Sequence, residues 1–225
     1  PYLNWYFKLS GKIEAAVDRS KEGREIVREL INDRRNSSIK EDDLLDMLLD
    51  ARYEDGEAME DEQLIDEILI LFTAGHETTS NALSFTTQLI AKHPKVQEKI
   101  SAEINTAKEL ANGDQMTFLK ETPYTKNVIE EAMRIYPPAY FIDRINFQDD
   151  EFNEMVIPKG TNLLFSVIEI QNDERFWKQP DMFDPTRFSR MQAKDYSGYY
   201  FPFGAGPRMC IGNNFAMYEM VLAIA

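Results

Sequence analysis

The chain has 225 residues, of which 25 are Lys or Arg and 39 are Asp or Glu, so its formal net charge is −14. This charge disfavours nonspecific nucleic-acid binding, because few cations are available to displace the counterions of phosphate. A hydrophobic content of 43% excludes wholesale disorder, and a single cysteine excludes an internal disulfide or a multi-cysteine zinc site. No secretory signal is present, and the uncharged stretch 78–91 is too short and polar to cross a bilayer. We expect a cytoplasmic protein, with any membrane anchor N-terminal to this chain.

Apolar residues at helical spacing predict a mainly α fold with a minor β-sheet, in one continuous domain. The expected helices cover residues 12–35, 44–49, about 60–92, 94–113, 122–136 and the segment from 211 onward. Thr122 is expected to cap the fifth of these helices, which two prolines end. Strand-like runs occur between 139 and 167, with Pro158 and Gly160 at turns, whereas 173–209 is expected to be irregular.

Residues 41–67 hold 13 acidic residues and one base, Arg52, which is typical of a solvated helix–loop–helix surface rather than a metal site. The sequence begins at Pro1 and closes on an apolar helical pattern over residues 220–225. We therefore expect a piece of a longer protein, a single partial domain over residues 1–225 that is truncated at both ends.

The lone cysteine, Cys210, lies in a loop whose sequence over residues 203–212 is FGAGPRMCIG. Three glycines and a proline predict a tight turn whose backbone a flat ligand can approach closely. The loop leads into a predicted helix, and the positive end of a helix dipole favours a thiolate. From the residues alone, this thiolate could serve as a nucleophile, a redox sensor or a metal ligand.

A nucleophile would need a base, and the chain has two histidines, His76 and His93. His93 precedes a proline and is expected at a helix start. His76 resembles the first ligand of a zinc-protease H-E-x-x-H motif, but Ser80 occupies the position of the second, which excludes that site. A Cys–His hydrolase stays open without a specific motif to support it.

Residues 74–79, AGHETT, place small residues beside an acid and two hydroxyls inside a strong helical pattern. Glycine within a helix costs about 1 kcal/mol relative to alanine, which indicates a need for space. A Thr hydroxyl bonded to the preceding turn would bend the helix there. The segment predicts either close helix packing or a groove for a small ligand, with groups for proton delivery.

Three segments together resemble the cytochrome P450 family of haem-thiolate monooxygenases: A-G-x-E-T-T at 74–79, E-x-x-R at 131–134 and F-x-x-G-x-R-x-C-x-G at 203–212. A fourth, FDPTRF at 183–188, is similar to the family's P-E-R-F segment, with Thr186 replacing the glutamate. Glu131 and Arg134, whose spacing alone is typical of a surface pair, would join Arg187 in a buried ion network. The resemblance covers essentially the whole chain. It implies the C-terminal portion of the P450 fold, without the early helices and the C-terminal sheet.

The resemblance also implies the site residues. Cys210 would be the thiolate ligand of the iron of haem b (iron protoporphyrin IX), and Arg208 and Arg144 would pair with its propionates. On the opposite face, Thr78 would hydrogen-bond dioxygen and Glu77 would belong to the proton-delivery chain, which makes these two the implied catalytic residues. The other implied cofactor-binding residues are Phe203, Gly204, Gly206, Gly212, Ala74 and Gly75.

The implied reaction is insertion of one oxygen atom of O₂ into a small apolar organic substrate. NAD(P)H would supply electrons through a ferredoxin, a flavodoxin or a flavin reductase. Residues 185–225 carry four bases against two acids, which suits an acidic partner near Cys210. Two alternatives are a haem-thiolate isomerase or dehydratase, against which the retained Glu77 and Thr78 argue, and a helical fragment without a function. The fragment itself is expected to be inactive, to hold haem weakly or not at all, and to self-associate.

Overall fold

The computed structural model describes residues 10–225 and divides into two compact units, residues 1–74 and 75–225. Helix α4 (Asp61–Lys92) contributes to both units, because the boundary falls within it. Within the described residues, the helices and small antiparallel sheets agree with the predicted fold class. The prediction of one domain includes residues 1–9, which lie outside the described residues.

The first unit contains helices α2 (Lys12–Asn36) and α3 (Leu44–Asp50) and the beginning of α4. Its core joins Val27 and Ile31 of α2 to Leu64 and Ile65 of α4. Arginines of α2 form ion pairs with several acids of the 41–67 stretch. The acidic stretch is therefore more than solvated surface, because some of its carboxylates form ion pairs that connect it to α2.

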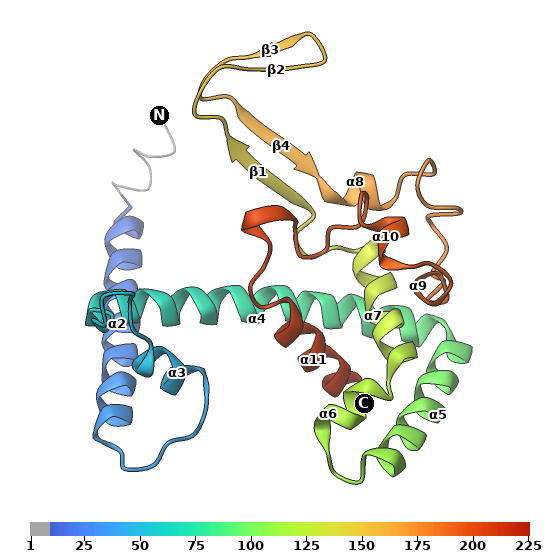
Figure 1. Cartoon of the computed structure of the whole chain (residues 1–225). Coiled ribbons are helices and arrows are strands. Elements are labelled where there is room, and N and C mark those ends of the chain that lie inside the picture. The colour runs from blue at the N-terminus through green and yellow to red at the C-terminus, as the bar shows by residue number, and fades with distance from the viewer. Residues whose placement is uncertain (1–9) are drawn as a thin grey trace. The chain divides into compact units, whose positions relative to one another are not determined.

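The second unit is built on helices that pack around α7 (Pro123–Ile135) (Figure 1). Its other helices are α5 (Pro94–Ala111), α6 (Gln115–Lys120), α8 (Val167–Gln171), α9 (Arg187–Arg190), α10 (Ala193–Tyr196) and α11 (Asn213–Ile224). One cluster joins α5, α6 and α7, and a second joins α4, α7 and α11. Among the described residues, no helix is both long and apolar enough to cross a bilayer.

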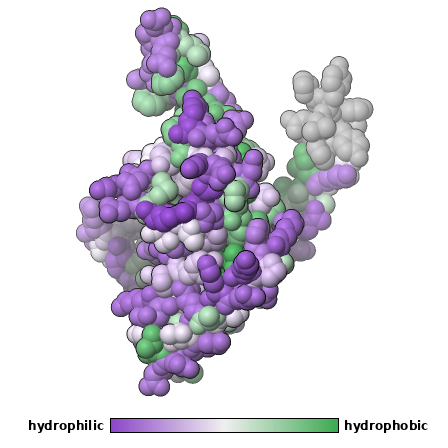
Figure 2. Space-filling model, turned by 90° about the vertical axis from the view of Figure 1, so that its right-hand side faces the viewer, coloured by the Kyte–Doolittle hydropathy of each residue, from purple (hydrophilic) through white to green (hydrophobic). Residues whose placement is uncertain are grey.

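Two antiparallel strand pairs occupy the predicted strand region. Strand β1 (Phe141–Ile145) pairs with β4 (Asn162–Ser166), and β2 (Asp150–Phe152) pairs with β3 (Met155–Ile157). The β2–β3 hairpin carries exposed apolar residues, and Figure 2 shows green, hydrophobic surface there among purple, hydrophilic surface. The two pairs give the minor β-sheet content that the sequence predicts.

The start of α7 differs from its predicted capping. Thr122 occupies the N-cap position, but its hydroxyl donates to the carbonyls of Phe118 and Leu119, both at 3.2 Å, instead of capping the helix. The carboxylate of Glu103, on α5, caps it by accepting from the backbone N–H groups of Tyr124 at 2.6 Å and Thr125 at 2.8 Å. An acid from another helix thus satisfies the free amides and favours the positive end of the dipole.

A cluster of aromatic rings organises the segment that was expected to be irregular. Trp177 is 1% exposed, and its ring lies 5.3 Å from Tyr199 and 6.0 Å from Tyr200, centroid to centroid. Phe188 and Tyr196 pack edge to face at 5.2 Å. Such packing holds a segment that has little regular secondary structure.

Candidate functional site

The Cys210 loop has the tight geometry that its sequence predicts. The Cys210 N–H donates to the carbonyl oxygen of Phe203 at 2.9 Å, which closes the loop. Gly204 and Gly206 have φ of 74° and 71°, a region that favours glycine. Cys210 itself is exposed and free, two residues before Gly212, the N-cap of α11. The loop therefore presents a thiol next to the start of a helix.

The surface beside this thiol is apolar. Met209 and Ile211 flank Cys210 and are 52% and 93% exposed, and Phe215, on the first turns of α11, is 73% exposed. A Cβ at Gly212 would lie 3.9 Å from the sulfur, in van der Waals contact, so glycine leaves the thiol accessible on that side. Exposed apolar surface concentrated around one polar atom is typical of a ligand site.

Strand β1 carries a cation on the face that approaches this loop. The Ile142 side chain approaches the loop, with its Cδ1 atom 3.8 Å from where a Cβ of Gly204 would lie. Arg144 is two residues further along β1, so it shares the strand face of Ile142. Its guanidinium is exposed and donates to the Asp143 carbonyl at 2.6 Å. Arg208, in the 3₁₀ turn Gly206–Arg208, is a second exposed cation of this loop.

The 74–79 segment is α-helical, as expected, and the bend at this point stays a prediction. Ala74 and Gly75 are exposed, and no atom of the described residues lies within 4 Å of a Cβ built at Gly75, apart from its chain neighbours and the helix backbone nearby. Within the described residues, this glycine is therefore not in close contact with another helix. Glu77 and Thr78 are exposed, whereas Thr79 is buried.

Helix α4 and the Cys210 loop meet in one apolar cluster of the second unit. Ala82 of α4 belongs to the cluster with Met220 and Val221 of α11, and Phe203 packs against it. Thr78 is four residues before Ala82 and so lies on the same face of α4. The cluster thus links the helix that carries Thr78 with the loop that carries Cys210.

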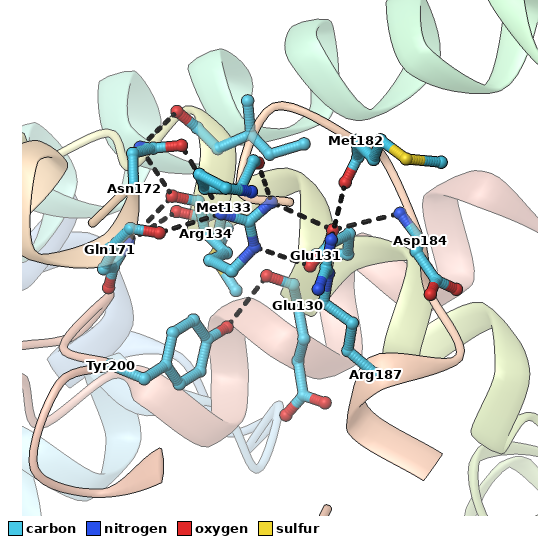
Figure 3. Close-up of polar contacts among 12 residues, drawn as sticks. Glu130, Glu131, Met133, Arg134, Gln171, Asn172, Met182, Asp184, Arg187 and Tyr200 are labelled. Carbon is cyan, nitrogen blue, oxygen red and sulfur yellow. Dashed lines mark hydrogen bonds and ion pairs between the residues drawn. The ribbon is translucent and has the colours of Figure 1, made fainter. Parts of the chain in front are cut away.

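A buried ion network joins α7 to the segment that precedes the cysteine (Figure 3). Arg134 donates to both carboxylate oxygens of Glu131, through Nε at 2.8 Å and a terminal nitrogen at 3.0 Å. Arg187 donates to Glu131 at 3.1 Å and to carbonyls of the 178–182 segment. The default surface interpretation of the Glu131–Arg134 spacing is therefore wrong, and the network implied by the resemblance is present.

Comparisons with known proteins identify the family. The family model for cytochrome P450 matches residues 2–225. The chain belongs to the cytochrome P450 family. It is 35% identical over 206 residues to cyclooctat-9-en-7-ol 5-monooxygenase of Streptomyces melanosporofaciens, covering 90% of this chain and 44% of that protein. It is 39% identical over 171 residues to cytochrome P450 3A6 of Oryctolagus cuniculus, covering 74% of this chain and 34% of that protein.

A solved P450 has the same fold. The cyanobacterial CYP120A1, bound to retinoic acid, aligns with a TM-score of 0.82 and 31% identity, covering 89% of this chain and 46% of that one. The chain thus spans less than half the length of each of these relatives. The structure therefore corresponds to part of the P450 fold, as predicted.

The residues present fit haem, the prosthetic group of P450 proteins. Haem is flat and largely apolar, carries two propionate carboxylates, and is held by a cysteine thiolate in P450 proteins. The exposed thiol of Cys210 lies among exposed apolar side chains, and Arg208 and Arg144 are exposed cations of the kind that two carboxylates require. A Cβ at Gly206 would meet no atom of the described part of the chain within 4 Å, its own chain neighbours aside, so the backbone itself is open to close approach.

Two residues that were not predicted from the sequence form hydrogen bonds that tie the segment leading into this P450 loop to α7 and α8. Tyr200 donates its phenol hydrogen to the Glu130 carbonyl at 3.0 Å, and burial raises the pKa of Tyr200 well above its usual value. Gln171 is fully buried and accepts from the Phe201 N–H at 2.8 Å. In the sequence, Tyr200 and Gln171 are an aromatic and a polar residue outside any helical or strand pattern. Their hydrogen-bond partners could therefore not be identified from the sequence.

Proposed function

We propose that this chain is the haem-binding part of a longer P450 monooxygenase. The enzyme inserts one oxygen atom of O₂ into a small apolar organic substrate, with electrons from NAD(P)H that arrive through a redox partner. The observation that carries this proposal is the accessible thiol of Cys210 in a tight glycine loop, within a chain whose family match covers residues 2–225.

Cys210 would hold the haem iron, while Arg208 and Arg144 would neutralise the propionates. Thiolate-ligated haem supplies activation of O₂, because the thiolate donates electron density that favours O–O cleavage. Phe203 would support the loop from the apolar cluster, and the amides of Gly204, Gly206 and Gly212 would lie near the sulfur and tune its basicity. Ala74 and Gly75 would leave room on α4 for a flat group.

Glu77 and Thr78 would govern proton delivery on the substrate side. Both side chains are exposed on one helix, next to small residues. A hydroxyl both donates and accepts hydrogen bonds, so Thr78 can pass on a proton that a carboxylate such as Glu77 draws from solvent. This pair favours oxygen chemistry over a haem-thiolate isomerase or dehydratase, which uses no external electrons.

The names of the relatives support an apolar substrate. One relative is named for cyclooctat-9-en-7-ol and another was solved with retinoic acid, both of which are largely hydrocarbon. We infer a substrate of this class. Arg187 is buried in the ion network, and the three exposed bases of residues 185–225, Arg190, Lys194 and Arg208, would favour an acidic ferredoxin, a flavodoxin or a flavin reductase as the redox partner.

The test of this proposal is the absorption spectrum of the reduced CO complex in the protein that contains this chain. We expect the Soret band of thiolate-ligated haem in the wild type and its complete loss in Cys210→Ser, because a serine hydroxyl does not replace the thiolate. Met209→Leu, which changes the neighbouring side chain and leaves the thiol, is the control. A thiolate-type spectrum in Cys210→Ser would exclude Cys210 as the ligand.

A further inference from the structure

Gln171, the last residue of α8, forms hydrogen bonds in two directions from a fully buried position (Figure 3). Its side-chain Nε2 donates to the carbonyl oxygens of Met133 at 3.0 Å and Arg134 at 3.2 Å. Its Oε1 accepts from the backbone N–H of Phe201 at 2.8 Å. One amide group therefore links α7 to the segment that leads into the Cys210 loop.

On the α7 side, these bonds satisfy the end of a helix. Met133 and Arg134 lie in the last turn of α7, whose final carbonyls have no partner within the helix. The main-chain carbonyl of Gln171 also accepts from the Arg134 guanidinium at 2.8 Å. The residue is thus bonded through its side chain and its backbone to the helix that carries the ion network.

On the other side, the bond to Phe201 is the first of a short series of bonds that reaches the cysteine. The Phe201 carbonyl accepts from the Gly204 N–H at 3.0 Å, and the Phe203 carbonyl accepts from the Cys210 N–H at 2.9 Å. Displacement of Phe201 would therefore shift both turns that place Cys210.

The position needs one side chain that both donates and accepts. A glutamine amide offers two N–H donors and a carbonyl acceptor in one plane. Burial makes each missing bond costly, because no water replaces the partner. An apolar residue would leave the Phe201 N–H without a partner, and a carboxylate would face two carbonyl oxygens with no hydrogen to share.

We propose that Gln171 is a positioning residue that fixes the Cys210 loop against α7 and so sets the geometry of the thiolate toward the haem. The haem part of this inference rests on the proposed function, whereas the effect on the loop does not. The two parts can be measured separately.

The first experiment is amide hydrogen exchange of the 225-residue chain, read on peptides that cover residues 201–210. Gln171→Met retains the length of the side chain and removes its hydrogen bonds. We expect roughly tenfold faster exchange in these peptides, which equals about 1.4 kcal/mol, with little change in α5. Asn172→Ala is the matched control, because Asn172 also contacts the end of α7, at 3.4 Å from the Arg134 guanidinium and 3.5 Å from the carbonyls of Arg134 and Ile135. Its strongest bond goes to the Ile168 carbonyl at 2.9 Å, and among the described residues it makes no hydrogen bond to 201–210.

A milder variant, Gln171→Asn, retains the amide but is one methylene too short to span both partners. If Gln171→Met loosens the whole chain, this variant decides the question: faster exchange confined to residues 201–210 supports the proposal. The proposal would be overturned if residues 201–210 of Gln171→Asn exchanged at the wild-type rate. It would also be overturned if Gln171→Met folded and these residues exchanged no faster than in Asn172→Ala.

The second experiment is the reduced CO spectrum of the haem-loaded protein that contains this chain. We expect Gln171→Met to bind haem but to show a smaller fraction of the thiolate-type band than Asn172→Ala. A full thiolate band in Gln171→Met would contradict the effect on ligand geometry. Absence of the band in the wild type would instead refute the proposed function, and the exchange result would still decide the effect on the loop.

Discussion

Thr78 lies on α4 between Glu77 and Thr79, and three residues after Gly75. Thr78 is exposed beside Glu77 and Gly75, where the helix leaves open space. Its hydroxyl is the one that we expect to control proton delivery.

We therefore predict that Thr78→Ala, in the protein that contains this chain, uncouples electron consumption from product formation. NAD(P)H oxidation should continue and peroxide should rise, while product per NAD(P)H falls by at least about tenfold, because a positioned proton donor is lost. The measurement is the ratio of product to NAD(P)H consumed, with Thr87→Ala as the control on the same helix. Equal losses of oxidation and product, without peroxide, would argue against this role.

Glu130 is an acid whose carboxyl group is held away from water. Burial raises the pKa of Glu130 above its ordinary value of 4.5, and Lys126 opposes this only in part. An acid with a raised pKa in the folded state destabilises the fold once it is ionised, so stability falls as the pH rises through that pKa. Below the ordinary pKa, the group is protonated in both states and the effect disappears.

Glu130→Gln should accordingly increase the free energy of unfolding at pH 7 and leave it nearly unchanged near pH 4. Each unit of pKa shift corresponds to about 1.4 kcal/mol, which sets the scale of the gain. Urea unfolding at the two pH values measures the difference, and Glu98→Gln, at an exposed site on α5, is the control. A gain that is the same at both pH values would mean that ionisation of Glu130 is not its cause.

At the scale of elements, α7 depends on a cap that belongs to another helix. Both carboxylate oxygens of Glu103 are used at the start of α7, and the second also accepts from the Thr125 hydroxyl at 2.7 Å. We expect Glu103→Ala to lower the free energy of unfolding by about 1–2 kcal/mol, through the lost cap and dipole interaction. Denaturant unfolding measures this, and Glu109→Ala, exposed on the same helix, should change it by less than about 0.5 kcal/mol. A similar loss in both variants would refute the capping role.

The helices show how much of the fold could be predicted from the sequence. The boundaries of α2, α4, α5 and α7 agree with the prediction to within about two residues, because each helix buries one periodic apolar stripe. Helices α6 and α8 were missed, since segments of six and five residues are too short to show a helical period. A helical pattern of apolar residues becomes visible only when several turns pack against a core. Helices α6 and α8 are one to two turns long and show almost no such pattern.

In the candidate site, features that depend on neighbouring residues could be predicted from the sequence, and features that depend on distant residues could not. The Cys210 loop was predicted because its glycines and cysteine are consecutive in the chain, and local chemistry is visible in local sequence. The buried state of Glu131 and Arg134 was not visible in their spacing, because it depends on Arg187 and on carbonyls about 40 to 50 residues away. The Gln171 bond to Phe201 spans a separation of 30 residues and has no signature in sequence.

At the scale of the whole molecule, the described surface is unusually apolar for a chain with a net charge of −14. Phe72, Phe147, Ile211 and Phe215 are each more than 70% exposed. Exposed apolar side chains of this size are usually covered in a functional protein, by a ligand or by other polypeptide. The 225-residue chain spans less than half of each relative named above, and we expect segments that those relatives have in addition to provide much of that cover.

We predict that the isolated 225-residue chain binds haem at least about a thousandfold more weakly than the longer protein, is inactive, and self-associates. Haem affinity comes largely from buried apolar area at about 25 cal/mol per Å², and a loss of about 4 kcal/mol gives this factor. Titration with haemin measures the affinity, and sedimentation velocity measures the association. A monomeric chain with stoichiometric haem and turnover would contradict the prediction.

Trp177 gives the molecule an optical property. The chain has two tryptophans, Trp5 and Trp177, so Trp5→Phe leaves a single indole fluorophore. The Arg134 guanidinium lies 5.2 Å from the centroid of the Trp177 ring, and the surrounding tyrosines are close enough to transfer excitation energy to it. The emission wavelength and intensity of Trp177 will therefore change when the Glu131–Arg134 pair opens. Stopped-flow fluorescence can then time the assembly of this buried charge network during folding, without any added label.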